Sequence, residues 1–208
     1  MRTRKSADAR KDEIIDATLE LADKLGPDSL TTGRIADAVG LTQPGIFRHF
    51  PTKQDLWEAV AARIGSVMTA RWDKAQRTKT DSLGRIRRLI IGQLRLIQST
   101  PAIPAILFSR ELHAQNGNLR RAFSALLNRF HQTIRSAVES AAAEGELRTD
   151  VDPDDAAFLI IGLVQGLAMR WSITGRTFDL AHEGERLLDI QLSGLTPGGM
   201  PENKETDK

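Results

Sequence analysis

The sequence has 208 residues, 40% of them hydrophobic and 27% charged, which suits one large or two small domains with a real core and excludes wholesale disorder. A formal net charge of +2 does not identify a nucleic-acid binder, and the absence of cysteine excludes disulfides, a thiol nucleophile and a cysteine-ligated zinc. Because leucine, isoleucine and alanine dominate and long stretches lack proline, we expect an all-α protein.

The positive charge is unevenly distributed along the chain. Residues 1–11 are rich in arginine and lysine, the following segment is acidic, and bases return at Arg48 and Lys53. This distribution suits contact with phosphates, although a solvated tail with ordinary surface charges would look the same. We interpret residues 1–8 as a flexible basic arm.

The first three predicted helices have the layout of a helix-turn-helix. An amphipathic helix over residues 9–25 stops at Gly26-Pro27, and a short helix ends at Gly40, where a left-handed residue allows a sharp turn. Thr42 then caps a helix over residues 43–50. In this motif the first helix of the pair braces a second that can lie in a DNA major groove. The positions left exposed and able to meet phosphates or bases include Arg34, Thr42, Gln43, Arg48, His49 and Lys53.

A long helix is predicted to follow, from Thr52 to about residue 79. Thr52 and Asp55 resemble a capping box, and at 1.5 Å per residue such a helix spans about 40 Å, enough to bridge two domains. The remaining pattern predicts further helices over residues 83–97, 102–113, 119–144, 153–174 and 180–195, with that at 102–113 short and bent by proline. We therefore expect an N-terminal three-helix head over residues 9–53, an effector-binding and dimerisation bundle over 54–196, and a disordered tail over 197–208.

The helix at 153–174 is apolar on nearly every side, which indicates burial on both faces. A small domain cannot easily cover both faces, so we predict a subunit interface here and in the last helix, and Gly162 with Gly166 would allow close approach of another helix. The predicted interface residues are Phe158, Ile161, Gly162, Gln165, Gly166, Leu188 and Leu192.

Aromatic and apolar side chains of the C-terminal part are candidates for lining a ligand pocket, because ligand sites in bundles commonly lie between helices. Each of these aromatics can equally be ordinary core. The predicted pocket residues are Trp72, Phe108, His113, Phe123, Phe130, Gln165, Met169 and Trp171, with Arg110 and Arg170 as further polar anchors. Few charges fall on these inner faces, which indicates a largely apolar ligand.

The stretch Gly40–Leu56, GLTQPGIFRHFPTKQDL, with the preceding LTTGRIADAV, resembles the DNA-binding signature of the TetR family of bacterial regulators. The nine-helix layout with a long fourth helix also resembles that family, whose members are typically homodimers with an effector pocket in the C-terminal helices. The resemblance implies a set of DNA contacts. It places Thr31 or Thr32, Arg34, Phe47, His49 and Lys53 at phosphates, and Thr42, Gln43, Pro44, Gly45 and Arg48 at bases or adjoining backbone.

Two positions depart from the family pattern. Phe47 stands where tyrosine is usual, so a phenolic contact is absent, and Pro44-Gly45 stands where the family commonly has glycine and then a small or hydroxylated residue. Gln43 and Arg48 remain as the main polar base readers.

The leading hypothesis is a cytoplasmic repressor that binds a palindromic operator as a homodimer, with its two reading helices about 34–36 Å apart. A small, largely apolar effector would tilt the long helix and release the DNA. A sequence-tolerant or activating DNA-binding protein is the alternative. A helical enzyme is a remote one, because the four histidines form no ligand spacing and no phosphate-binding glycine loop or nucleophile–base pattern is visible. We expect no metal and no cofactor.

Overall fold

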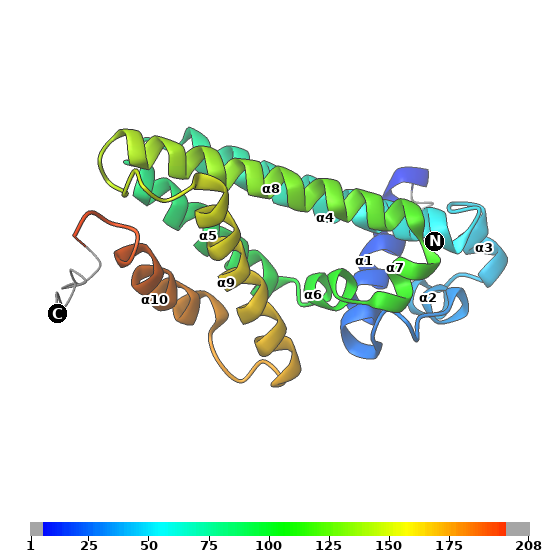
Figure 1. Ribbon diagram of the computed structural model, residues 1–208. Helices are drawn as coiled ribbons and strands as arrows, with labels where there is room; N and C mark the ends of the chain where they lie inside the picture. Colours follow the sequence, from blue (N-terminus) through cyan, green and yellow to red (C-terminus); the bar gives the residue numbers. More distant parts are fainter. Residues whose placement is uncertain (1–5, 199–208) are drawn as a thin grey trace. The chain divides into compact units, whose positions relative to one another are not determined.

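A computed structural model describes residues 6–198, and within them the chain forms ten helices and no strand (Figure 1). The all-α prediction is therefore confirmed for this part of the chain. The helices are α1 (Ala7–Leu25), α2 (Thr32–Val39), α3 (Gln43–Phe47), α4 (Lys53–Arg77), α5 (Ser82–Ser99), α6 (Ala102–Leu107), α7 (Arg110–Gln115), α8 (Gly117–Ala143), α9 (Pro153–Ile173) and α10 (Leu180–Ser193).

The helices form two compact units. The described part of the first unit is residues 6–70 and 99–128, and that of the second is residues 71–98 and 129–198. Helices α4 and α8 each contribute their first part to the first unit and their second part to the second unit. These units divide the chain differently from the predicted segments 9–53 and 54–196, whose boundary stays a prediction.

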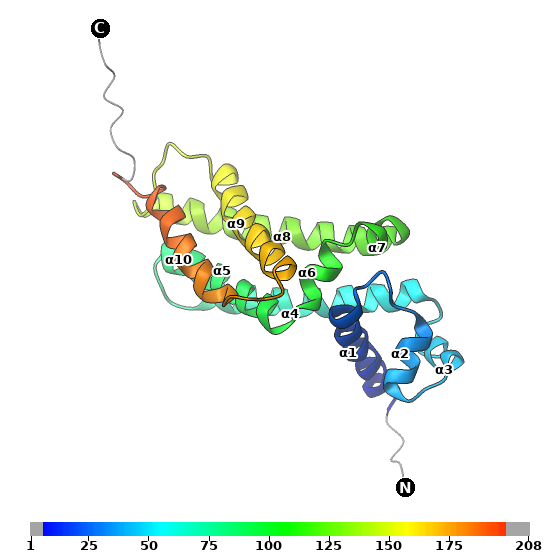
Figure 2. The same ribbon diagram turned by 90° about the horizontal axis from the view of Figure 1, so that it is seen from below.

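In the first unit, α1 packs on α2 and α6, and α2 packs on α3 (Figure 2). The core of this unit also contains side chains of α4 and α8. Ile14 of α1, Trp57 of α4 and Leu119 of α8 are among its most buried residues. The first part of α8 is tied to α4, since the amide nitrogen of Asn118 donates to Glu58 at 2.5 Å. These contacts place α6, α7 and the start of α8 in the same unit as the helix-turn-helix.

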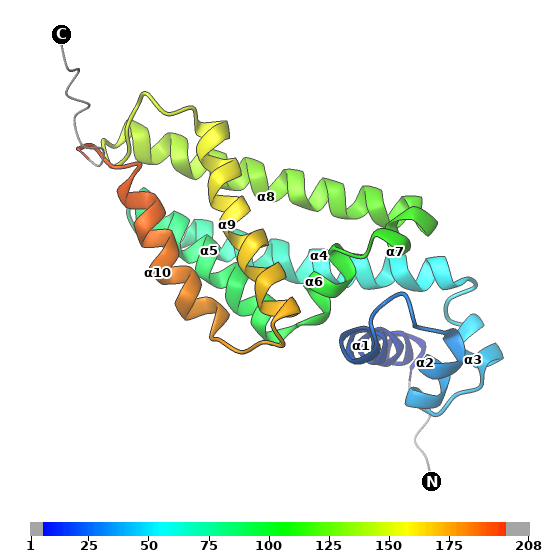
Figure 3. The same ribbon diagram turned by 60° about the horizontal axis from the view of Figure 1, so that its bottom comes forward.

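In the second unit, α9 packs on α10 (Figure 3). Gly184 of α10 leaves room for Leu94 of α5, because a Cβ at that glycine would lie 2.1 Å from the Leu94 side chain. The carboxylate of Asp179 caps α10 by accepting from the backbone N–H of His182 at 3.0 Å, and this hydrogen bond lowers the pKa of Asp179. Helix α9 is also long and apolar enough to cross a membrane by length and composition, a test that core helices of soluble proteins pass as well.

The structure differs from the predicted elements in three places. Helix α1 begins at Ala7 rather than residue 9, because the Ser6 hydroxyl accepts from Ala9 N at 3.1 Å and caps it. Helix α3 ends at Phe47, and residues 48–50 form a turn. The bent helix expected over 102–113 is two helices, since Ser109 caps α7 through the backbone N–H of Leu112 at 3.0 Å. Residues 1–5 of the predicted arm and residues 199–208 of the predicted tail lie outside the described residues.

Candidate nucleic-acid interface

The turn between α2 and α3 has the sharp geometry that the sequence predicts. Gly40 adopts φ 64° and ψ 38°, a left-handed conformation that residues with a Cβ rarely adopt. Its N–H donates to the carbonyls of Ala36 and Asp37, and Leu41 N donates to Ala36 O at 2.9 Å. We call residues 31–50, which contain α2, this turn and α3, the reading head.

Each helix of the reading head is capped by a threonine at its N-terminus. The Thr31 hydroxyl accepts from Arg34 N and the Thr42 hydroxyl accepts from Gly45 N, both at 3.3 Å. Such caps satisfy backbone N–H groups that have no partner inside the helix. Buried apolar side chains then fix the angle between the helices; they are Ile35, Ala36, Val39, Ile46 and Phe50.

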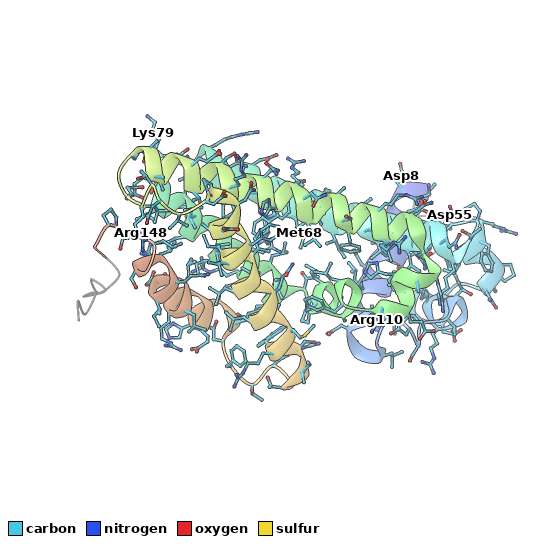
Figure 4. The ribbon with its side chains drawn as sticks, viewed as in Figure 1. Asp8, Asp55, Met68, Lys79, Arg110 and Arg148 are labelled. Carbon is cyan, nitrogen blue, oxygen red and sulfur yellow. The ribbon has the colours of Figure 1, made fainter. Side chains whose placement is uncertain are left out.

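The capping box at the start of α4 is confirmed. Thr52 N donates to Asp55 Oδ2 at 2.8 Å, and Asp55 N donates to Thr52 Oγ1 at 3.0 Å. Asp55 is labelled in the first turn of α4 in Figure 4. Lys53 is exposed in the same turn, so its ammonium group can reach a phosphate.

Most of the residues predicted to contact DNA are on the surface of this part of the chain. Thr31, Arg34, Thr42, Gln43, Pro44, Phe47, Arg48 and Lys53 are exposed, and Gly45 and His49 are half-buried. Thr32 differs, since only 8% of it is exposed and its hydroxyl accepts from Gln43 Nε2 at 2.8 Å. The sequence left open whether Thr31 or Thr32 contacts a phosphate. Thr31 is exposed and Thr32 is buried.

A cavity of about 430 Å³ lies in the same unit, between α6, α7 and α8. Its lining residues come from one continuous stretch of the chain: Leu107, Phe108, Ser109, Arg110, His113, Ala114, Arg120, Phe123, Ser124 and Leu127. His113 Nε2 lies 3.1 Å from Leu107 O, and its ring meets the Phe123 ring edge-on at 5.7 Å between centroids. We call this space the α6–α8 cavity.

The cavity is tied directly to the segment that precedes the reading head. Ser109 Oγ donates to Asp28 Oδ1 at 2.5 Å while it caps α7 (Figure 4 labels the neighbouring Arg110). A second connection joins Gln54 of α4 to the carbonyl of Gln115 at the end of α7, at 3.3 Å. Displacement of α7 would therefore act on both ends of the reading head.

The predicted pocket residues are divided between this cavity and the second unit. Phe108, His113, Phe123 and the anchor Arg110 line the cavity. Trp72 and Phe130 instead stack on each other at 4.7 Å in the core of the second unit, where Trp72 Nε1 donates to Gln93 at 3.0 Å. Trp171 is buried and donates to Phe178 O, Gln165 is half-buried, and Met169 and Arg170 are exposed.

Sequence reasoning missed six residues of the cavity lining: Leu107, Ser109, Ala114, Arg120, Ser124 and Leu127. A signal for Arg120 was present, because it lies in the first turn of α8, where the helix dipole disfavours a cation, as for Lys53. Ser109 had no comparable signal, since its partner Asp28 lies 81 positions away in the sequence. Among residues 6–198, no group of three or more acidic, histidine or cysteine residues is arranged to hold a metal ion.

Some of the predicted interface residues are exposed and others are buried. On α9, Phe158 is 67% exposed, and Gly162 and Gly166 have open space where a Cβ would stand. Ile161, Leu188 and Leu192 are buried within the chain itself. The exposed apolar residues of this surface are Phe158, Leu159, Met169 and Ile173 of α9 and Ile190 of α10, which we call the α9–α10 face.

Known protein families match both the N-terminal and the C-terminal helices of this chain. The family described as "Bacterial regulatory proteins, tetR family" matches residues 14–60, and "Tetracyclin repressor-like, C-terminal domain" matches residues 104–183. The chain belongs to the TetR family. It is a DNA-binding transcriptional regulator with the TetR fold, in which the helix-turn-helix precedes a helical C-terminal domain.

Individual relatives of this TetR-family regulator are distant in sequence. It is 26% identical over 163 residues to the nucleoid occlusion factor SlmA of Vibrio cholerae, covering 78% of this chain and 83% of that protein. The structure of the ketosteroid transcriptional regulator KstR2 of Mycobacterium tuberculosis superposes with a TM-score of 0.76 at 19% identity, over 90% of this chain and 95% of that one. The fatty acid degradation regulator FadR of Bacillus halodurans gives 0.78 at 16% identity, over 93% and 98%.

Proposed function

We propose that this TetR-family regulator is a cytoplasmic repressor that binds a palindromic operator as a homodimer and leaves it when a small molecule binds. The observation that carries the proposal is the surface formed by the reading head and the start of α4, on which Arg34, Arg48 and Lys53 are exposed together with the N-terminal end of α3. Basic side chains at phosphates supply affinity, and side chains at base edges supply sequence preference.

In this proposal Arg48 is the principal base reader. A bidentate arginine–guanine contact contributes on the order of 1–3 kcal/mol of discrimination against other bases. Gln43 has a narrower role, because its amide nitrogen already donates to Thr32 and leaves its carbonyl oxygen free to accept from a base. Adenine N6 and cytosine N4 are the donors that such an oxygen accepts from in the major groove.

The remaining predicted residues contact or approach the sugar–phosphate backbone. Thr31, Arg34, His49 and Lys53 are assigned to phosphates, and Phe47, 38% exposed, to apolar contact with sugar or a thymine methyl. Thr42, Pro44 and Gly45 bring the start of α3 close to the DNA. Thr32 contributes through Gln43 rather than by contact.

The α9–α10 face supports the assignment of a homodimer. Phe158 and Ile173 are 67% and 78% exposed in the single chain, and exposed apolar patches of this kind mark interaction surfaces. A second copy packed there would place two reading heads on one DNA duplex, related by a dyad. The operator would then contain two inverted half-sites one helical turn, or a multiple of it, apart.

The α6–α8 cavity is the proposed effector site. Its volume of about 430 Å³ lies within the range of about 300–1,000 Å³ that is typical of small-molecule sites. A ligand there would contact α7, which is bound to Asp28 and Gln54 on either side of the reading head. Ligand binding would thus shift the protein away from its DNA-binding conformation.

The deciding experiment is selection of binding sites from a random DNA pool, followed by fluorescence anisotropy on the selected duplex. We expect an inverted repeat bound at least about 10³-fold more tightly than a scrambled duplex. Arg48→Ala should lower that ratio about tenfold or more, because it removes a base contact from each half-site. The matched variant Arg34→Ala should instead weaken both duplexes alike and reduce the salt dependence of binding.

A sequence-tolerant DNA-binding protein is the second candidate, favoured by the similarity to proteins named nucleoid occlusion factors. It predicts selected DNA without an inverted repeat and nearly equal affinity for the scrambled duplex. Full operator preference in Arg48→Ala would remove this residue from its assigned role.

A further inference from the structure

The α6–α8 cavity is lined by apolar side chains and by two arginines. The apolar side chains among its lining residues are Leu107, Phe108, Ala114, Phe123 and Leu127. Its charged residues are Arg110 and Arg120, both exposed, and its lining contains no aspartate or glutamate. Glu111 follows Arg110 in the sequence but does not line the cavity, and its carboxylate accepts from the amide of Gln115 at 3.1 Å. The cavity therefore has positive charge that its own lining does not neutralise.

The two arginines of the cavity differ from their neighbours in lacking partners. Within the described residues 6–198, neither Arg110 nor Arg120 has a hydrogen bond or an ion pair from its guanidinium group. By contrast, Arg121 donates to Asn118, and Arg129 pairs with Asp73 at 3.1 Å. Two free guanidinium groups in the lining of one cavity are suited to an oxyanion, which each can bind through two parallel N–H donors.

Other polar groups of the cavity lining are also available. His113 uses Nε2 toward the carbonyl of Leu107, while its Nδ1 is buried without a hydrogen-bond partner in the described part of the chain. A buried polar atom in that state costs free energy, so a polar ligand group that reaches it is stabilised. Ser124, which is exposed, also lines the cavity.

From this arrangement we infer that the effector is an amphipathic anion, with an apolar body against Phe108, Phe123 and Leu127 and a carboxylate or phosphate group between Arg110 and Arg120. The inference deepens the proposed function, on which it rests, by giving the chemical class of the effector. It also corrects the sequence-based expectation of a largely apolar ligand, which took no account of Arg120.

Direct binding without DNA tests the class of ligand, using four straight-chain compounds of eight carbons each. Titration calorimetry with octanoate, octyl phosphate, 1-octanol and octylamine compares an anionic, a neutral and a cationic head group. We expect both anions to bind at least about fivefold more tightly than 1-octanol, and octylamine to bind more weakly. Raising the salt concentration should weaken the anions and leave 1-octanol unchanged. The tighter of the two anions identifies the head group.

Three variants locate the contact. Arg110→Gln and Arg120→Gln should each lower octanoate affinity a few-fold, and together they should abolish its advantage over 1-octanol. Arg121→Gln is the matched control, because Arg121 lies next to Arg120 in α8 but does not line the cavity. Circular dichroism of each variant confirms that the helices remain folded.

The outcomes are separable from those of the DNA experiment. Four results would each overturn the inference. They are equal affinity for octanoate and 1-octanol, tighter binding of octylamine than of the anions, no binding of any of the four compounds, and a loss of octanoate affinity in Arg121→Gln equal to that in the cavity variants. None of these results depends on operator binding. If octanoate binds as expected and leaves operator affinity unchanged, the ligand class stands and the proposed release mechanism fails.

Discussion

The reading head and the α6–α8 cavity lie in the same unit of the protein, yet they are built from interactions of very different range. In the reading head, Thr31 and Thr42 each cap a helix through a backbone N–H three residues later. The cavity needs α6, α7 and α8 together, and Ser109 reaches Asp28 across 81 positions. The DNA-binding surface is therefore determined locally, whereas the regulatory surface exists only in the folded unit.

The largest expected effect tests how tightly the reading head is built. Ile46→Ala removes a side chain that is 1% exposed and should lower the free energy of unfolding by about 2–5 kcal/mol. Leu127→Ala, at a cavity wall position that is 36% exposed, should lower it by about 1 kcal/mol or less. Urea denaturation followed by circular dichroism measures both values.

Octanoate titration of the same two variants completes this comparison. Leu127→Ala should weaken octanoate binding while it leaves operator affinity nearly unchanged. An equal stability loss in the two variants would mean that the cavity wall is as tightly packed as the reading head, and the contrast between the two regions would fail.

The range of the interactions also explains what could be predicted from the sequence. Gly40, Thr42 and the Thr52–Asp55 capping box act on backbone within three or four residues, so their spacing alone was sufficient. The split between α6 and α7 was missed for the opposite reason. Ser109 is a helix cap that also needs the carboxylate of Asp28, and no pattern along the chain relates these two residues.

Helical periodicity identifies an apolar face but does not say what covers it. The apolar face of α10 was predicted to meet a second subunit, yet Leu188 and Leu192 are buried within the chain, and Ile190 is the 59% exposed residue. The aromatics Trp72 and Phe130 were candidates for a pocket and are stacked in a core. In both cases the residue type was compatible with two environments, and only tertiary packing distinguishes them.

A smaller effect is expected where the two regions are joined. Asp28→Ala removes the carboxylate that Ser109 binds and leaves every residue that lines the cavity in place. Octanoate affinity should therefore be retained, while the factor by which octanoate lowers operator affinity should fall about threefold or more, since coupling between sites is commonly about 5–150-fold. Anisotropy titrations of the operator with and without octanoate measure this factor.

Asp37→Ala is the control for the lost charge. Asp37 is an exposed acid of α2 outside the cavity lining, so both variants make the region near the DNA less negative. If Asp37→Ala reduced the coupling as much as Asp28→Ala, the effect would be electrostatic, and the contact between Ser109 and Asp28 would have no part in it.

The smallest effect concerns a side-chain hydrogen bond that joins α2 to α3 inside the reading head. Thr32→Val removes the hydroxyl that accepts from Gln43 Nε2 at 2.8 Å while it keeps the shape of a side chain that is only 8% exposed. Without this partner the Gln43 amide can rotate, so discrimination at one base pair of each half-site should fall about two- to fivefold. Affinity for scrambled DNA should not change, because no phosphate contact is lost.

A double-mutant cycle decides whether Thr32 acts through Gln43. Gln43→Ala should remove the preference at the same base pair, and adding Thr32→Val to it should have no further effect. A loss that is uniform over all sequences, or one that adds to that of Gln43→Ala, would place Thr32 among the direct DNA contacts instead. Since the two residues are eleven positions apart, a dependent pair would mean that part of the base preference already relies on how α2 packs against α3. Local interactions would then determine the backbone of the reading head, but only part of its base preference.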